Sequence, residues 1–174
     1  MLKTERLSKH HDRKRFDCGS DALNSYLKKT ARQHIDKGIA KTFVIVDDTR
    51  PGDILGFFTL VFCEVSAKDL PSKFAKKYPR KVPAAKLARL AVASARQRRG
   101  LGTEMMISAM RRILSVSENI GIIGFFVDAE NEDAKGYYEQ FGFIPLPNDP
   151  LKLFLPMATL HEAYAGFSTI PSVS

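Results

Sequence analysis

Residues 90–103 read LAVASARQRRGLGT, an apolar segment followed by a basic turn that contains two glycines. The Leu-Ala-Val at residues 90–92 is typical of the end of a buried β-strand. Apolar residues then recur at helical spacing, which predicts a helix from Gly100 to Ser117. Glycine at a helix start lets the backbone approach a ligand, and the free N–H groups and helix dipole favour an anion there. The junction is therefore a candidate anion-binding loop.

The glycine pattern of this loop does not match the longer phosphate-binding motifs. A Walker loop needs Gly-Lys-Ser/Thr, which does not follow Gly100, and a dinucleotide fingerprint needs a glycine where Met105 stands. Arg96, Arg98 and Arg99 add positive charge beside the loop. Taken alone, the pattern also fits a flexible turn that contains glycine and binds no ligand.

Outward from the loop, the hydrophobic pattern predicts alternating strands and helices. The strand over residues 54–65 is nearly apolar, so we expect both of its faces to be covered. The order predicts an α/β fold with a mixed sheet and helices on its faces. We expect a single domain over residues 1–165 and a flexible tail over 166–174. The predicted helices cover 20–37, 71–77, 100–117 and 132–141, and the predicted strands cover 42–46, 54–65, 86–92, 120–127, 143–144 and 151–156.

Composition excludes several classes of protein. The 174 residues are 44% hydrophobic and 26% charged, which is ordinary for a globular protein and excludes wholesale disorder. Cys18 and Cys63 are too few for a disulfide framework or a CxxC zinc site, and His10 and His11 lack further ligands at metal spacing, so we expect no metal. The longest uncharged apolar run, residues 54–63, is half the length of a membrane span. Without a signal-peptide pattern, we expect a cytoplasmic protein with no membrane partner.

Charge is distributed unevenly along the chain. The net charge is +8, and residues 68–99 contain eleven basic side chains against one acid. Such a basic flank attracts a polyanion, and in nucleic acid it would contact the backbone and not read bases. A solvated surface without a specific partner is the alternative, and Lys28 and Lys29 in particular fit that reading. The candidate phosphate contacts are Lys28, Lys29, Lys73, Lys76, Lys77, Arg80 and Lys81.

Two motifs occur in the order found in one enzyme family. The pattern Gln97-x-x-Gly100-x-Gly102 after the Leu-Ala-Val strand, followed by Asn131-x-x-Ala134-x-x-x-Tyr138-x-x-x-Gly142-Phe143, resembles GCN5-related N-acetyltransferases (GNATs) over about residues 40–157. The resemblance implies the GNAT fold, with a central, mixed, mostly antiparallel sheet of about six or seven strands and helices on both faces. This fold is α/β, or α+β in some schemes.

The same resemblance implies acetyl-CoA as the acetyl donor and assigns the residues that bind it. The strand before the loop would pair with the pantetheine arm through its backbone, the loop amides would hold the pyrophosphate, and an asparagine would add a contact. The implied cofactor-binding residues are Leu90, Ala91, Val92, Gln97, Arg98, Arg99, Gly100, Leu101, Gly102, Thr103 and Asn131.

Tyr138 is the implied catalytic acid, which protonates the departing thiolate. A thiol has a pKa of about 8.5 and tyrosine of about 10, so a phenol is a mild acid suited to that proton. The alternative is a structural aromatic on the helix face beside Phe141. Tyr137, next in sequence, leaves the choice between the two tyrosines open.

Further motifs narrow the resemblance to the acetyltransferase toxins of toxin–antitoxin pairs. Residues 16–27 (FDCGSDALNSYL), 31–33, 42–44, 88–92 and 118–121 carry this likeness, which then spans about residues 6–157. It implies acetylation of the α-amino group of aminoacyl-tRNA, which blocks translation. It also implies a cognate antitoxin of the ribbon-helix-helix type and a homodimer.

A missing base agrees with such an acceptor. Residues 86–92 contain no glutamate, which many acetyltransferases acting on lysine or polyamines place on this strand. A lysine amine has a pKa of about 10.4 and needs a base, whereas an α-amino group at about 7.7–8.0 is already partly neutral. Glu64 and Asp128 remain possible carboxylates. Two other functions stay open: an N-acetyltransferase for polyamines or aminoglycosides, and an acyl-CoA-binding module without catalysis.

Overall fold

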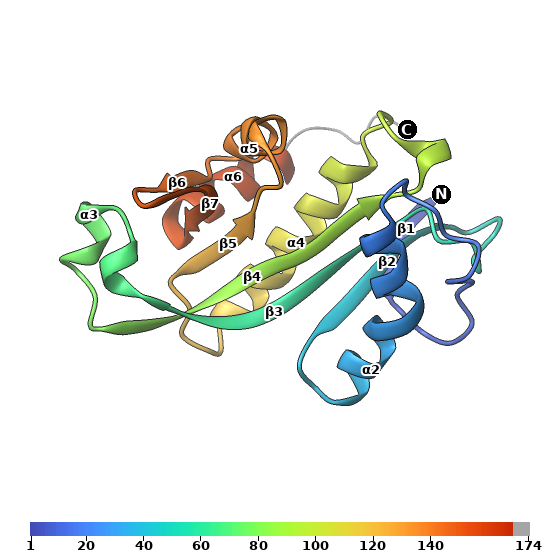
Figure 1. Ribbon diagram of the computed structural model, residues 1–174, viewed down its shortest axis with the longest axis horizontal. Helices are drawn as coiled ribbons and strands as arrows, with labels where there is room; N and C mark the ends of the chain where they lie inside the picture. The colour runs from blue at the N-terminus through green and yellow to red at the C-terminus, as the bar shows by residue number, and fades with distance from the viewer. Residues whose placement is uncertain (169–174) are drawn as a thin grey trace. The chain divides into compact units, whose positions relative to one another are not determined.

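The computed structural model describes residues 1–168, and its seven strands form one sheet in the order β1-β2-β3-β4-β5-β7-β6 (Figure 1). The β1–β2, β2–β3, β5–β7 and β6–β7 pairings are antiparallel, and β4–β5 is parallel. The predicted mixed, mostly antiparallel α/β sheet is therefore confirmed. The strands are β1 (Leu2–Arg6), β2 (Lys41–Asp47), β3 (Gly56–Ser66), β4 (Lys81–Val92), β5 (Gly124–Asp128), β6 (Ile144–Leu146) and β7 (Asp149–Pro156).

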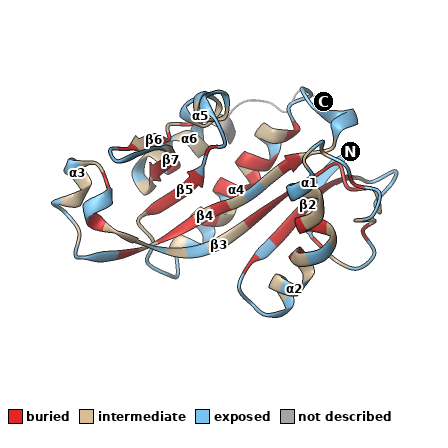
Figure 2. Ribbon diagram, in the orientation of Figure 1, coloured by how far each residue is buried: buried red, intermediate tan, exposed pale blue. Residues whose placement is uncertain are grey.

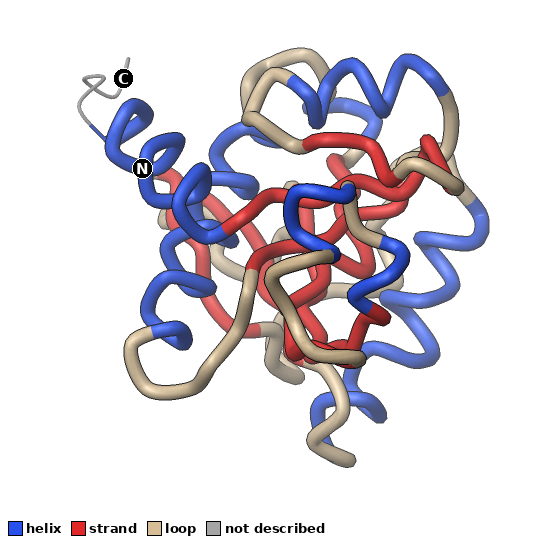
Figure 3. Tube along the Cα trace, turned by 90° about the vertical axis from the view of Figure 1, so that its left-hand side faces the viewer, coloured by secondary structure: helices blue, strands red, loops and turns tan. Residues whose placement is uncertain are grey.

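Helical segments connect these strands (Figure 3). They are α1 (Asp21–Ser25), the π-helical η1 (Tyr26–Thr30), α2 (Ala31–Asp36), the 3₁₀ turns η2 (Ala67–Asp69) and η3 (Ser94–Arg96), α3 (Ser72–Ala75), α4 (Leu101–Ser117), α5 (Glu132–Glu139) and α6 (Met157–Ser168).

The chain forms two compact units. Unit 1 comprises Met1–Val61 and Ala88–Ala109, and unit 2 comprises Phe62–Leu87 and the chain from Met110 onward. The chain passes between them within β3, β4 and α4. A single domain over residues 1–165 stays a prediction.

In unit 1, a helical segment packs on β2. Ser20 is its N-cap and accepts a hydrogen bond from the Leu23 amide at 3.3 Å. Gly38, with φ +74°, ends it, because glycine adopts that conformation without strain. The predicted uninterrupted helix is wrong in one respect, since η1 inserts a π turn between α1 and α2. The core beneath contains Leu27, Ala31, Val44, Val46 and Phe57.

In unit 2, stacked aromatic rings join neighbouring strands. The rings of Phe126 and Phe154 lie 4.8 Å apart, and Phe74 meets Phe154 edge-on at 5.3 Å. Leu70 completes the cover from the connection between β3 and β4. Burying one such side chain contributes about 1.5–3 kcal/mol, and Figure 2 shows β5 almost entirely buried.

Three strand predictions need correction. β1 was not predicted, because Lys3, Glu5 and Arg6 interrupt any apolar signal, yet the strand pairs with β2 at an edge of the sheet. β3 is buried only in its first half, and Phe62 is 62% exposed, so the expected cover on both faces is wrong. β4 starts at Lys81 and not at residue 86, because Pro83 needs no N–H there and its carbonyl accepts from the Ile123 amide at 2.9 Å.

Two further predictions, both in the C-terminal half of the chain, also need correction. β5 begins at Gly124, whereas residues 120–123 form a loop in which Ile120 is 60% exposed. A helix over Met157–Ser168 was not predicted, and it includes the first three residues of the expected flexible tail. The rest of that tail, residues 169–174, lies outside the described residues.

Candidate active site

In unit 1, the basic loop between β4 and α4 is held at its start by Gln97. The Gln97 Nε2 donates to the carbonyl of Val92 and to the carbonyl of Cys18, each at 3.1 Å. One amide thus ties the loop to the strand it leaves and to the segment that precedes α1. Gln97 therefore has a structural task beside its predicted role in cofactor binding.

Left-handed backbone turns the loop into the start of α4. Arg98 has φ +64° and Gly100 has φ +81°, and the Gly100 carbonyl accepts the first helical bond from Glu104 at 3.1 Å. Arg98, Arg99 and Gly100 are exposed. The first N–H groups of a helix have no partner within it and attract anions. The geometry fits the predicted anion-binding loop over residues 97–103.

The last residues of β4 continue past its parallel partner. The β4–β5 register covers only Ala85↔Phe125 to Leu87↔Val127, whereas β4 runs on to Val92. The expected backbone contacts of Leu90, Ala91 and Val92 with pantetheine stay a prediction. Gly56 of β3 allows this end of β4 to pack closely against it, because a Cβ at residue 56 would lie only 2.9 Å from the Ala91 carbonyl oxygen.

In unit 2, α5 presents Tyr138. Asn131 is the N-cap of α5, and its Oδ1 accepts from the Ala134 amide at 2.9 Å, which leaves the amide nitrogen as its group for any cofactor contact. The Tyr138 ring packs edge-on against Phe143 at 5.8 Å, and Phe143 lies 5.7 Å from Phe125 of β5. Tyr138 therefore packs toward the sheet.

The environment of Tyr138 keeps its hydroxyl protonated. Burial raises its pKa to about 12, and the charges of Tyr137 and Glu130 act in the same direction. This value exceeds the pKa of about 10 assumed from sequence. The phenol is therefore protonated at physiological pH, but it is a weaker acid than expected. Tyr137 packs on Phe141 of the same segment at 5.3 Å, and the choice of Tyr138 as the acid stays a prediction.

An ion pair that sequence analysis missed joins β4 to β5. Lys86 Nζ lies 2.6 Å from Asp128 Oδ2. Asp128 was named from sequence as a possible carboxylate, but its partner was not, because parallel strands far apart in sequence bring the two together. Burial raises the pKa of the nearby Cys63 thiol, an effect that Lys86 and Lys152 oppose. Glu64, the other possible carboxylate, is exposed.

The fold also gathers Glu5, His10 and His11 within 4.8 Å of one another, a cluster not visible in the sequence. His11 Nδ1 accepts from the Ser8 amide at 3.0 Å, so neutral His11 carries its proton on Nε2, which lies 2.7 Å from Glu5 Oε1. A nitrogen that holds a proton is not a metal ligand. The cluster is therefore a hydrogen-bonded contact that stabilises this part of unit 1. The expected lack of a metal site stays a prediction.

The candidate phosphate contacts fall into two groups. In unit 2, five cationic side chains around α3 are exposed, and two of them lie over aromatic rings: Lys73 over Phe74 at 5.5 Å and Lys77 over Tyr78 at 5.9 Å. In unit 1, Lys28 is half-buried and Lys29 exposed on η1. The five around α3 are Lys73, Lys76, Lys77, Arg80 and Lys81.

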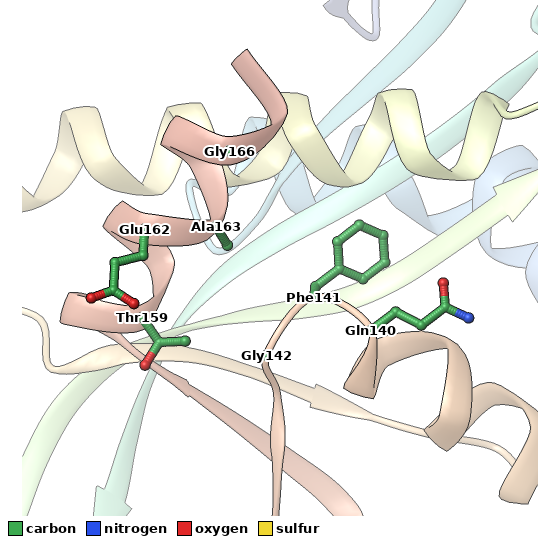
Figure 4. Close-up of a pocket in the computed structure, with 7 residues that line it drawn as sticks. All are labelled: Gln140, Phe141, Gly142, Thr159, Glu162, Ala163 and Gly166. Carbon is green, nitrogen blue, oxygen red and sulfur yellow. The ribbon is translucent and has the colours of Figure 1, made fainter. Parts of the chain in front are cut away.

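Unit 2 contains two pockets of interest. One, of about 460 Å³, lies where α5 ends beside α6 and is lined by Phe141, Thr159 and Ala163 among others (Figure 4). No predicted site residue lines it. A second, of about 370 Å³, is lined by Glu64, Asp69, Phe126 and Lys152 together with neighbouring residues.

The fold and the loop motif define an acyl-CoA-dependent transferase. Residues 6–143 match the Acetyltransferase (GNAT) family, and the chain belongs to this family. The predicted family and fold are therefore confirmed.

The relatives of this chain include toxins. It is 34% identical over 152 residues to a "tRNA-acetylating toxin" of Mycobacterium tuberculosis, covering 87% of this chain and 90% of that protein. The structure of AtaT complexed with acetyl-methionyl-tRNA has a TM-score of 0.85 and 35% identity, covering 94% and 99% of the two chains. A tyrosine-to-phenylalanine mutant of AtaT bound to acetyl-CoA and the C-terminus of the antitoxin AtaR has a TM-score of 0.77 and 30% identity, covering 94% and 98%.

Across residues 1–168, no helix is both long and apolar enough to cross a membrane.

Proposed function

We propose that this protein is a toxin that transfers the acetyl group of acetyl-CoA to the α-amino group of an aminoacyl-tRNA and so blocks translation. The observation that carries the proposal is the GNAT loop between β4 and α4 in a chain 35% identical to AtaT, which was captured with an acetylated aminoacyl-tRNA. Acting on tRNA, the protein would work in the cytoplasm.

Acetyl-CoA is the proposed donor substrate. The amides at the start of α4 would hold its pyrophosphate, and Arg98 and Arg99 would add positive charge. The backbone of Leu90, Ala91 and Val92 would pair with the pantetheine arm. These assignments combine the family's pattern with the exposure of the loop and the extension of β4 beyond β5.

The chemistry requires one bond to form and one to break. The neutral amine nitrogen bonds to the thioester carbonyl carbon, the carbon–sulfur bond breaks, and the nitrogen's surplus proton leaves to water. Tyr138 donates its hydroxyl hydrogen toward the sulfur as negative charge develops there. With a pKa of about 12, the phenol acts mainly as a hydrogen-bond donor while the carbon–sulfur bond breaks. The departing thiolate then takes a proton from this phenol or from water and leaves as the thiol.

An α-amino group fits this site better than a lysine-type amine. The β4 segment 86–92 offers no carboxylate to remove a proton from an amine of pKa about 10.4. An α-amino group is partly neutral at physiological pH without such help. The exposed cations around α3, together with Lys28 and Lys29 on η1, would hold the phosphates of the tRNA.

Two partners complete the proposal. We infer a cognate antitoxin, because the related AtaT binds the C-terminus of its antitoxin, and the sequence resemblance to such toxins implies the ribbon-helix-helix type. We also infer a homodimer, which would combine two basic surfaces along one tRNA.

Label transfer tests the function. The protein is incubated with radiolabelled acetyl-CoA and, separately, with charged total tRNA, deacylated tRNA, or a mixture of polyamines and aminoglycosides. Label on charged tRNA alone, lost in Tyr138→Phe and kept in Tyr137→Phe, supports the proposal. Label on the small amines would instead favour a small-molecule N-acetyltransferase, and full growth inhibition by Tyr138→Phe would favour a module that acts without catalysis.

A further inference from the structure

Lys86 and Asp128 lie on one face of two neighbouring strands. Lys86 is the register partner of Phe126 in the parallel β4–β5 pairing, and Asp128 follows Phe126 by two residues, so all three side chains share a face. The Lys86 Nζ to Asp128 Oδ2 distance is 2.6 Å.

Much of that face in unit 2 is apolar, although Lys152, the register partner of Asp128, adds a further charge to it. Ala84, Phe126, Leu146 and Phe154 form a buried cluster beside the pair. Only 27% of the Lys86 side chain is exposed, so its charge is partly desolvated there. A partly desolvated ion pair at such a place adds little stability compared with apolar side chains of similar size. A stabilising role therefore does not explain why Lys86 and Asp128 are paired beside this cluster.

The position of Asp128 along the chain connects it to the catalytic segment. It is the last residue of β5, directly after the β4–β5 pairing ends at Leu87↔Val127. Four residues later, at Glu132, α5 begins, and the pKa of its Tyr138 is influenced by the charge of Glu130. Asp128 thus stands at the end of the strand that leads into the helix of the proposed acid.

Asp128 remains accessible while Lys86 holds it. Its side chain is 55% exposed. Lys86 contacts Oδ2, and this contact fixes the orientation of the whole carboxylate, including Oδ1. On the far side of β5, Asp128 is the register partner of Lys152, which lines the 370 Å³ pocket together with Phe126. Asp128 does not itself line this pocket, but its register partner Lys152 does, so the carboxylate lies next to the pocket wall.

We propose that Asp128 binds the α-amino group of the acceptor and that Lys86 is a positioning residue that orients this carboxylate. The inference rests on the proposed function, because an acceptor amine is its ligand. Oδ1 accepts a hydrogen bond from the amine or ammonium nitrogen and directs its lone pair once the proton has left to water. The amino-acid side chain of the acceptor extends into the 370 Å³ pocket.

The direct test compares two ligands that differ by the aminoacyl group. Binding of deacylated tRNA and of a non-hydrolysable, amide-linked aminoacyl-tRNA is measured without acetyl-CoA. The wild-type protein should bind the aminoacyl form about 10- to 100-fold more tightly, the range for one charged hydrogen bond. Asp128→Asn should bind deacylated tRNA at least as tightly as the wild type does and lose most of this preference.

A matched control separates this effect from general electrostatics. Removing any negative charge should strengthen attraction to tRNA, so a loss of affinity in Asp128→Asn has the opposite sign. Glu118→Gln, at an exposed site at the end of α4, removes one negative charge elsewhere and should keep the aminoacyl preference.

Kinetics assign the role of Lys86. Lys86→Met should lower kcat/KM for aminoacyl-tRNA about tenfold with an unchanged KM for acetyl-CoA, and Lys86→Arg should restore most of it. Asp128→Glu, with its charge moved by one methylene, should lie between the wild type and Asp128→Asn, and it serves if the asparagine variant does not fold.

The outcomes are separable. If the wild type acetylates charged tRNA but Asp128→Asn retains the aminoacyl preference, the role of Asp128 is wrong and the proposed function stands. An equal loss for deacylated tRNA would also overturn it. If the wild type acetylates no charged tRNA, the proposed function itself fails.

Discussion

Gln97 Nε2 donates to the carbonyl of Cys18, a residue 79 positions earlier in the chain, at 3.1 Å, and the same amide reaches the Val92 carbonyl. The loop that is proposed to bind the cofactor is thus anchored to the segment before α1. Preorganisation of this kind lowers the ordering that a ligand must impose on a loop.

Loss of this anchor should weaken cofactor binding. Gln97→Ala removes two hydrogen bonds, each worth about 0.5–1.5 kcal/mol, so we expect a roughly tenfold higher KM for acetyl-CoA and a small loss of stability. The KM for aminoacyl-tRNA should change little. Gln33→Ala, at an exposed glutamine of α2, is the control. An unchanged KM for acetyl-CoA in Gln97→Ala would show that the anchor does not shape the loop.

Glycine should be required at position 100 because of the backbone conformation there, and not because a larger side chain would clash. Its φ is +81° and a Cβ there would meet nothing within 4 Å, so Gly100→Ala costs about 1–2 kcal/mol through strain alone. The change should raise the KM for acetyl-CoA as the loop relaxes. Gly121→Ala also meets open space, but without a positive φ, and it should behave as the wild type. Equal behaviour of both variants would contradict this account.

The two neighbouring tyrosines should separate in rate and in titration. Tyr138→Phe should lower kcat by about 10²–10⁴-fold, whereas Tyr137→Phe should have a small effect. Because the pKa of Tyr138 is raised to about 12, activity should not fall through its ionisation below about pH 11. Ultraviolet difference titration of wild type against Tyr138→Phe measures this pKa, and a midpoint near 10 would be incompatible with a buried phenol.

The Glu5–His11 contact should make stability depend on acid pH. The hydrogen bond from His11 lowers the pKa of Glu5 below its ordinary value of 4.5. A lowered folded-state pKa stabilises the protein above the unfolded pKa, and this contribution disappears as pH falls through the folded value. Urea unfolding should show wild type more stable than Glu5→Gln at pH 7, with the gap closing below about pH 4.5. A gap that widens on acidification would reverse the sign of this linkage.

The cations around α3 should set the salt dependence of RNA binding. Changing Lys73, Lys76 and Lys77 to alanine should weaken tRNA binding and reduce the slope of log K against log salt by about 0.7–0.9 for each lost phosphate contact. Lys9→Ala, at another exposed lysine, is the control. A slope that is unchanged in the triple variant would place the tRNA elsewhere.

Sequence predicted the parts of the fold that have local signals. The Leu-Ala-Val strand end and Gly100 at the start of α4 are such local signals. β1 escaped notice because an edge strand can alternate charged residues. The two halves of β3 have similar hydrophobicity in the sequence. They differ in the structure, because the pairing of β3 with β2 ends at Lys41↔Leu60.

The site was predictable only where its residues form motifs. Gln97 and Tyr138 stand in such motifs, but the bond from Gln97 to Cys18 and the raised pKa of Tyr138 follow from tertiary packing. The partnership of Lys86 with Asp128 depends on parallel pairing of strands separated by α4. Contacts between residues far apart in one sequence carry no local signal, so these needed coordinates.

The most direct measurement identifies the acetylated atom. Charged tRNA is incubated with the protein and acetyl-CoA and digested with nuclease, and the 3′-terminal aminoacyl-adenosine is examined by mass spectrometry. We predict a mass increase of one acetyl group on the α-amino nitrogen, present with wild type and absent with Tyr138→Phe. Unmodified aminoacyl-adenosine, with acetyl-CoA consumed on another acceptor, would contradict the proposal that aminoacyl-tRNA is the substrate.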